Sequence, residues 1–267
     1  MEKIGLIAGN RKFPLLFSQA AKKNNLYVVA VAIKGDTSKE LKKYADEIHW
    51  IGLDQFSRMF DIFKERGVSN IVMAGQISPK RLFSKEIKKD DELQKILTSV
   101  KDKRADTLFA AVADKLKEAG FSLLDSSVFL KDFMPAKGRL TEPDLSPLQW
   151  EDVSFGLSLA KAVAELDIGQ TVAVKEKAVV AIEALEGTDN LIRRAGKIAG
   201  DNIVVVKVSK PRQDMRFDIP VVGLNTIKNL ARVKAACLAI EAEKTLFIDQ
   251  RESVKLAQKK GIAIVAI

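Results

Sequence analysis

The chain of 267 residues is long enough for one large domain or two domains of modest size. Hydrophobic residues make up 47% and charged residues 30%, a balance typical of a globular protein, and no apolar run approaches the roughly 18–20 residues that span a membrane. The net charge of +9 admits nucleic acid, an anionic membrane or a phosphorylated substrate as partner. Lysines interleaved with acids, and an aromatic content of only 6%, favour a solvated surface over a nucleic-acid interface.

The N-terminal half alternates strand patterns with helix patterns. We expect strands at 3–8, 27–33, 49–51, 70–74 and 121–124. We expect helices at 13–24, 38–43, 54–66, 90–100 and 105–119. This alternation predicts an α/β fold with a Rossmann-like parallel sheet and helices on both of its faces.

In such sheets, ligands bind beyond the carboxyl ends of the strands. Gly9 and Gly75 both fall at these ends. The first loop, from Gly9 to Pro14, reads Gly-x-x-x-x-Pro rather than Gly-x-Gly-x-x-Gly, which disfavours NAD. Arg11 and Lys12 in this loop are either phosphate or headgroup contacts or simple surface residues.

A change in composition at 131–150 predicts a linker between two domains. Helix breakers interrupt this stretch at Pro135, Gly138, Pro143 and Pro147. The domains are therefore expected at 1–130 and 151–267. In the second domain we expect helices at 151–165, 189–198, 226–243 and 251–260, and strands at 171–174, 178–184, 203–208, 245–248 and 262–267. Two α/β domains with a ligand cleft between them form the expected architecture.

A single cysteine and a single histidine narrow the possible chemistry. Cys237 excludes an internal disulfide, and its apolar surroundings predict a place in a buried helix. His49 lies in a strand-like run, where a structural role is expected. Catalytic triads with a serine or cysteine nucleophile are excluded unless His49 acts as their histidine. A zinc site of Cys and His ligands cannot be built. What remains is carboxylate chemistry with Mg²⁺ or Mn²⁺ on a phosphorylated substrate.

The stretch 178–194 predicts a junction between a buried strand, 178–182, and a helix. Three carboxylates follow the strand: Glu183, Glu186 and Asp189. Gly187 permits a sharp turn, and Thr188 is a good N-cap for the helix. Free backbone N–H groups at a helix start bind anions, and nearby carboxylates bind divalent cations. The alternative is an ordinary strand-to-helix junction with solvated acids.

The stretch 210–220 combines an arginine with two aspartates. If it is extended, Asp214, Arg216 and Asp218 share one face. An arginine between two carboxylates fits a site that holds a phosphate and its metal ion, although a structural ion pair on a loop is equally compatible. Thr226 follows as a candidate helix cap and ligand contact.

Several motifs together resemble one family. They are Gly5-Leu-Ile-Ala-Gly9 followed by Pro14, Ala74-Gly75, Asp167-Ile-Gly-Gln170, Glu186-Gly-Thr-Asp189 with Arg193, and Gln213-x-x-Arg216-x-Asp218-x-Pro220-x-x-Gly223-x-x-Thr226. Their combination, in this order and over nearly the whole chain, resembles the UDP-2,3-diacylglucosamine pyrophosphatases of the two-domain α/β type, which act in lipid A synthesis. One departure lies in the first loop, where Arg11 and Lys12 replace the smaller, glycine-rich residues of the family.

The resemblance implies a reaction in which water cleaves the diphosphate of UDP-2,3-diacylglucosamine. UMP and 2,3-diacylglucosamine 1-phosphate (lipid X) are the implied products, with attack at the β-phosphorus. It also implies Mg²⁺, with Mn²⁺ as the alternative, held by the family's essential aspartate at Asp218 with help from Asp189 or Glu186. Arg216 and Arg193 are expected to bind phosphate oxygens. Asp218, Arg216 and Asp189 are thus the expected catalytic residues.

Substrate contacts are expected along the same motifs, at Gly9, Asn10, Arg11, Lys12, Gly75, Gln76, Gln170, Glu186, Gly187, Thr188, Arg193 and Thr226. The excess of lysine and arginine would help docking on an anionic membrane. The N-terminus lacks the order of a signal peptide, so we expect a cytoplasmic protein that is peripheral at the inner leaflet of the inner membrane. No nucleic-acid partner is expected, and a homodimer is left open.

Two alternatives remain at this point. A hydrolase of a soluble nucleotide sugar would lack an elongated apolar cavity. A non-catalytic protein that binds nucleotide sugars or lipids would show no turnover, and Asp218→Asn would leave its binding intact.

Overall fold

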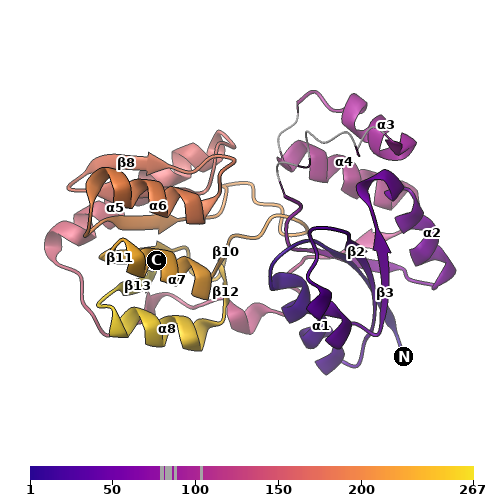
Figure 1. Ribbon diagram of the computed structural model, residues 1–267, viewed down its shortest axis with the longest axis horizontal. Helices are drawn as coiled ribbons and strands as arrows, with labels where there is room; N and C mark the ends of the chain where they lie inside the picture. Colours follow the sequence, from indigo (N-terminus) through magenta and orange to yellow (C-terminus); the bar gives the residue numbers. More distant parts are fainter. Residues whose placement is uncertain (79–80, 82–85, 87–88, 103–104) are drawn as a thin grey trace. The chain divides into compact units, whose positions relative to one another are not determined.

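The computed structural model describes residues 1–78, 81, 86, 89–102 and 105–267 (Figure 1). The chain forms two compact units. Unit 1 comprises Met1–Leu130 and Asp214–Asp218, and unit 2 comprises Lys131–Gln213 and Ile219–Ile267. Residues 131–150, which we expected to form a linker, therefore belong to unit 2. The short segment 214–218, which we expected in the second domain, belongs to unit 1.

Unit 1 contains, within its described residues, a five-stranded parallel sheet of order β3-β2-β1-β4-β5. The strands are β1 (Lys3–Ala8), β2 (Tyr27–Ile33), β3 (Glu47–Ile51), β4 (Asn70–Ala74) and β5 (Ser122–Leu123). The helices are α1 (Phe13–Lys23), α2 (Arg58–Glu65), α3 (Asp91–Ser99) and α4 (Ala105–Glu118), with 3₁₀ turns η1 (Lys39–Lys43) and η2 (Leu53–Gln55). The predicted parallel sheet and its helices are confirmed.

The central strands of unit 1 are apolar because both of their faces are covered. β1 and β2 are buried along nearly their whole length, as is typical of parallel sheets packed between helices. Gly5 has no room for a side chain, since a Cβ atom there would lie 2.9 Å from the side chains of Phe63 and Val68. The glycine therefore lets Phe63 of α2 pack directly on β1.

Unit 2, all of whose residues are described, is built on a mixed six-stranded sheet of order β6-β13-β11-β9-β7-β8. The strands are β6 (Gly138–Arg139), β7 (Thr171–Lys175), β8 (Ala178–Ile182), β9 (Val204–Lys207), β11 (Cys237–Ile240) and β13 (Ala263–Ala266). Strands β9, β11 and β13 are parallel, whereas β6 and β7 run antiparallel to their neighbours in that set and β8 runs antiparallel to β7. A separate pair, β10 (Val221–Gly223) and β12 (Leu246–Ile248), is parallel. The helices are α5 (Pro147–Glu165), α6 (Thr188–Ala199), α7 (Leu224–Arg232) and α8 (Gln250–Lys259).

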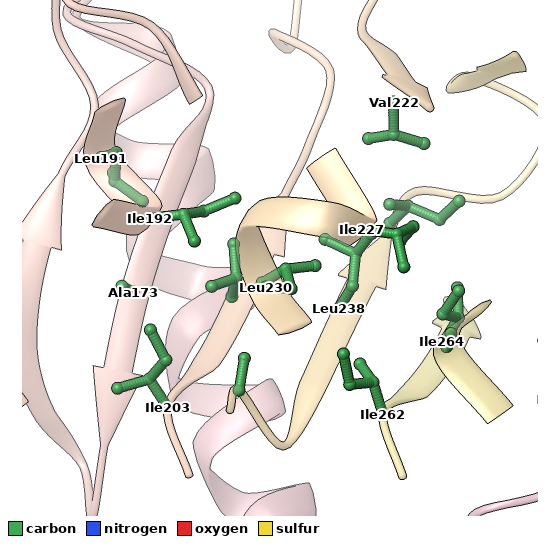
Figure 2. Packing of buried hydrophobic residues seen from close by; sticks show 14 of the residues in the cluster. Ala173, Leu191, Ile192, Ile203, Val222, Ile227, Leu230, Leu238, Ile262 and Ile264 are labelled. Carbon is green, nitrogen blue, oxygen red and sulfur yellow. The ribbon is translucent and has the colours of Figure 1, made fainter. Parts of the chain in front are cut away.

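Helices cover both faces of this sheet. On one face, Leu191 and Ile192 of α6 and Ile227 and Leu230 of α7 pack with Leu238 of β11 (Figure 2). On the other face, α5 packs against the alternate residues of β7 and β9. Because successive side chains of a strand point to opposite faces, the near-continuous apolar runs of β7 and β9 supply both cores.

Strand β8 differs from the buried strand that we predicted. It is an edge strand, antiparallel to β7, and Ala178 and Val179 are exposed. A hairpin joins β7 to β8, and its residues Glu176 and Lys177 both have positive φ, as two-residue turns with a right-handed strand twist require. A short apolar run of β-branched residues does not by itself distinguish a buried strand from an edge strand.

The predicted helix 226–243 is also wrong in its second half. Helix α7 ends at Arg232, and the apolar run that follows forms the central strand β11, which includes Cys237. The expected burial of Cys237 is correct, and this burial raises the pKa of its thiol. A run that is apolar on all sides fits a buried helix and a buried strand equally well.

Candidate functional site

Two glycine loops meet at the carboxyl edge of the unit 1 sheet. The N–H of Gly9 donates to Ala74 O (2.8 Å), and the N–H of Asn10 donates to Gln76 O (2.8 Å). A Cβ atom on Gly9 would lie 2.7 Å from the backbone N of Gln76, and Gly75 has φ +83. Neither position accepts a larger residue without a backbone shift. The loops after β1 and β4 are thereby held together.

This contact brings together four of the predicted substrate residues, namely Gly9, Asn10, Gly75 and Gln76. Arg11 and Lys12 follow in the same loop, and their side chains are exposed. Arg11 has φ +65, which is uncommon for a residue other than glycine, asparagine or aspartate. Lys12 is the N-cap residue of α1, so the two basic side chains lie at the start of that helix.

The segment Asp214–Asp218 is not extended, so the condition under which Asp214, Arg216 and Asp218 would share one face of a strand is not met. It forms a turn in which the N–H of Asp218 donates to Asp214 O (3.0 Å). The guanidinium of Arg216 binds the Asp214 carboxylate through Nε (2.9 Å) and Nη2 (2.7 Å). This ion pair lowers the pKa of Asp214 and raises the pKa of Arg216. The alternative of a structural ion pair thus describes Asp214 and Arg216.

The strand-to-helix junction in unit 2 has the predicted glycine but a different cap. Gly187 is the N-cap residue of α6, with φ 79 and ψ 162, a region that is essentially open only to glycine. Thr188 is the first helical residue rather than the cap. Its hydroxyl donates instead to Glu183 Oε1 (2.9 Å), which follows β8. The hydroxyl therefore ties the start of α6 to the end of the edge strand.

Lys207 is a residue that the sequence reasoning missed. It ends β9 beside Thr171 of β7 and is only 6% exposed. Its Nζ donates to Thr188 Oγ1 (2.9 Å) and more weakly to Thr171 Oγ1 (3.4 Å), and lies 3.9 Å from Glu183 Oε2. A lysine inside the otherwise apolar run 203–208 was the signal in the sequence, because lysine is rarely buried unless it is paired.

The first turns of α6 and α7 are joined by side chains. Asn225 Nδ2 donates to Asp189 Oδ2 (2.7 Å), and both Asp189 and Thr226 are buried. Arg193 donates to Asn190 Oδ1 (2.5 Å) and Asn229 Oδ1 (3.5 Å). The predicted residues Thr188, Asp189, Arg193 and Thr226 are therefore grouped on these two helices. The cap of α7 is Gly223, so the prediction that Thr226 caps this helix is wrong.

Two further predicted residues lie on the loops beside this group. Glu186 is exposed and accepts from Arg194 Nη2 (2.5 Å), and although its partial burial acts to raise its pKa, the bond from Arg194 lowers it overall. Gln170 accepts from the N–H of Val208 (2.9 Å) through its backbone carbonyl. The neighbouring Gly169 leaves no room for a side chain, because a Cβ atom would clash with the carbonyl of Glu183.

Glu241 fixes the loop through which the chain leaves β9. Its Oε2 accepts from Lys161 Nζ (2.6 Å) and from Ser209 N (2.9 Å) and Oγ (2.7 Å), and its Oε1 accepts from Lys244 Nζ (2.7 Å). Burial alone would raise the pKa of Glu241, but the bonds from Lys161, Lys244 and Ser209 outweigh it and lower the pKa to about 2. The ionised carboxylate therefore stabilises the fold.

We expect Glu241→Gln to destabilise the protein by on the order of 3 kcal/mol at pH 7. Because the pKa of the folded state is depressed below its ordinary value of 4.5, this contribution is fully present above about pH 4.5 and is lost as the pH falls toward 2. Urea unfolding at several pH values measures the difference, with the exposed Glu165→Gln as the control. A difference from wild type that stays constant between pH 7 and pH 3 would contradict this assignment.

The predicted metal ligands lie in different units, Asp218 in unit 1 and Asp189 in unit 2. Among the described residues, no three His, Cys, Asp or Glu side chains are grouped so that they hold a metal ion by themselves. Mg²⁺ is commonly bound through one or two carboxylates, with water and substrate phosphates completing its shell. A single carboxylate such as Asp218 therefore fits Mg²⁺ better than it fits an ion that demands a full protein cage.

The fold and these residues define a two-unit α/β protein. Carboxylates, basic side chains and glycine turns lie near the ends of its strands. The sequence matches the LpxI N-terminal domain over residues 3–133 and the LpxI C-terminal domain over residues 136–265. The chain belongs to the LpxI family. It is 27% identical over 280 aligned positions to the UDP-2,3-diacylglucosamine pyrophosphatase LpxI of Caulobacter vibrioides, covering 100% of this chain and 98% of that protein.

Two of the solved structures that this chain matches show a distant likeness. The N5-carboxyaminoimidazole ribonucleotide synthetase of Thermotoga maritima has 17% identity and a TM-score of 0.26, covering 71% of this chain and 43% of that one. The phosphoribosylglycinamide synthetase of Anaerococcus prevotii has 10% identity and a TM-score of 0.28, and the match covers 67% of this chain and 38% of that one. The chain thus spans less than half the length of these proteins, and TM-scores this low do not establish a common fold. Among the described helices, none combines the length and apolar composition that a membrane crossing requires.

Proposed function

We propose that this protein hydrolyses the diphosphate of UDP-2,3-diacylglucosamine to UMP and 2,3-diacylglucosamine 1-phosphate. The observation that carries the proposal is the match to the Caulobacter pyrophosphatase along the full length of both chains. The motifs that suggested the family lie in both units, within the stretches 3–133 and 136–265 that match the two family domains, which supports the proposal. The reaction would place the protein in lipid A synthesis, at the inner leaflet of the inner membrane.

The chemistry of a diphosphate explains the kinds of residue at the candidate site. Attack by water requires charge neutralisation and positioning more than covalent catalysis. Mg²⁺, when bound, would neutralise the phosphate oxygens and lower the pKa of the attacking water. Asp218 is the proposed ligand, with Asp189 as the second candidate. Arg193 and Arg216 are the proposed phosphate contacts, although each already binds a side chain of its own unit.

Hydrolysis in ¹⁸O-enriched water tests this function directly. Purified protein is incubated with UDP-2,3-diacylglucosamine and Mg²⁺, and with EDTA as the control. We expect UMP only when Mg²⁺ is present, with the label in the sugar phosphate, because we propose attack at the β-phosphorus. Label in UMP would move the attack to the α-phosphorus. The absence of UMP formation by folded protein would contradict the proposal and favour a carrier that binds without turnover.

A further inference from the structure

The segment that carries Asp218 is held on unit 1 by one buried serine. The N–H of Ser126 donates to Met215 O (2.9 Å), and its hydroxyl lies 2.6 Å from both Arg216 O and Met73 O. Ser126 is 0% exposed and follows β5, whereas Met73 lies at the carboxyl end of β4. One serine therefore ties the segment 214–218 to the edge of the sheet, beside the Gly9 and Gly75 loops.

A second contact anchors the same segment through an aromatic ring. Phe217 packs with Phe109 of α4 at a centroid distance of 5.6 Å, and it belongs to the apolar cluster of unit 1. The turn between Asp214 and Asp218 is closed by the backbone bond described above. Ser126 thus holds the backbone at Met215 and Arg216. The packing of its ring on Phe109 holds Phe217, the residue immediately before Asp218.

We propose that Ser126 is a positioning residue for the Asp218 carboxylate. The inference depends on the metal-binding role proposed for Asp218. Asp218 is the last residue of the unit 1 segment, and Ile219 already belongs to unit 2. The contacts of the residues that precede Asp218 therefore contribute to its placement. Ligand groups must be held within about half an ångström of their working geometry, and a misplacement of about 1 Å typically costs about 100-fold in rate.

The adjacent serine provides a matched control. Ser127 is also buried, but its hydroxyl donates to Asp125 Oδ1 (2.6 Å) and not to the segment 214–218. Ser126→Ala removes the hydroxyl that contacts Arg216 O and Met73 O, whereas Ser127→Ala removes a hydroxyl of equal size one residue away. Both variants lose a hydroxyl of a buried serine, and thermal unfolding of each measures how far a general loss of stability contributes.

The experiment uses the full-length protein and Mn²⁺ as the probe. Mn²⁺ binding without substrate is followed by electron paramagnetic resonance, and the Mg²⁺ concentration for half-maximal hydrolysis is measured in parallel. We expect Ser126→Ala to weaken Mn²⁺ binding and to raise the Mg²⁺ requirement by about 10-fold or more, while Ser127→Ala stays within about 2-fold of wild type. Ser126→Cys keeps the shape of the side chain but has a larger atom and a weaker donor than the hydroxyl, so it should lie between wild type and Ser126→Ala.

The positioning role of Ser126 and the proposed function are distinguished by different results. If wild-type protein binds Mn²⁺ and Ser126→Ala and Ser127→Ala behave alike, Ser126 does not position Asp218. If Ser126→Ala does not fold, Ser126→Cys with unchanged Mn²⁺ binding gives the same negative result. If wild-type protein neither binds Mn²⁺ nor hydrolyses the substrate, the proposed function is itself wrong.

Discussion

Replacing Asp218 by asparagine is expected to lower the rate of hydrolysis of UDP-2,3-diacylglucosamine by at least about 100-fold, because a metal ion that stabilises transition-state charge contributes several kcal/mol. Asparagine keeps the size of the side chain and removes its charge. The fold should therefore be unchanged, and the backbone bond from Asp218 to Asp214 should remain. Initial rates over a range of Mg²⁺ concentrations measure the effect.

The control for this substitution is Asp61→Asn on the exposed side of α2, which should retain wild-type rates. Thermal unfolding of both variants separates a loss of chemistry from a loss of structure. Wild-type turnover by folded Asp218→Asn would show that the Asp218 carboxylate has no role in the reaction. It would also remove the basis for a positioning role of Ser126.

Lys207→Met is expected to destabilise the protein by about 3–5 kcal/mol, because it leaves a buried carboxylate without its counter-charge. Glu183 is 8% exposed, and its Oε2 has no hydrogen-bond partner in unit 2, every residue of which is described. Lys207, at 3.9 Å, supplies the compensating charge, and Thr188 bridges the two groups. Methionine fills the space of the lysine stem without the ammonium.

The double variant Lys207→Met with Glu183→Gln tests this explanation. Removing both charges should recover much of the lost free energy of unfolding, because neither group is then left unpaired. Lys244→Met, at an exposed lysine paired with Glu241, provides the control and should cost less than about 1 kcal/mol. Urea unfolding is measured for wild type, for Lys207→Met and Glu183→Gln alone, for the double variant and for the control. Additive losses in the double variant would show that Lys207 and Glu183 do not stabilise each other.

The parallel sheet of unit 1 could be predicted because its signals are local. Apolar runs bounded by glycine and polar turns define β1, β2 and β4, and the regular spacing of apolar residues defines the helix α2. Gly9 and Gly75 could also be placed, since the carboxyl ends of parallel strands lie on one edge of a sheet. Their direct contact could not, because it depends on the register between β1 and β4.

The errors lie where tertiary contacts override the local pattern. The segment 214–218 has an alternation that suits an extended strand, but the pairing of Asp214 with Arg216 and the packing of Phe217 fold it into a turn. Cys237 lies in a run that is apolar on every side, so its periodicity could not separate helix from strand. Lys207 was overlooked because its partners, Glu183 and Thr188, come from another part of the chain.

The order in which the two units can fold during synthesis follows from the way the chain is divided between them. Domains commonly fold from the N-terminus as the ribosome extends the chain. Unit 1, however, includes residues 214–218, which emerge only after the stretch 131–213 of unit 2. A nascent chain that ends at Leu130 still lacks Phe217 for its apolar cluster and Arg216 O for the Ser126 hydroxyl. The N-terminal unit should therefore complete its structure late in translation, together with its C-terminal neighbour.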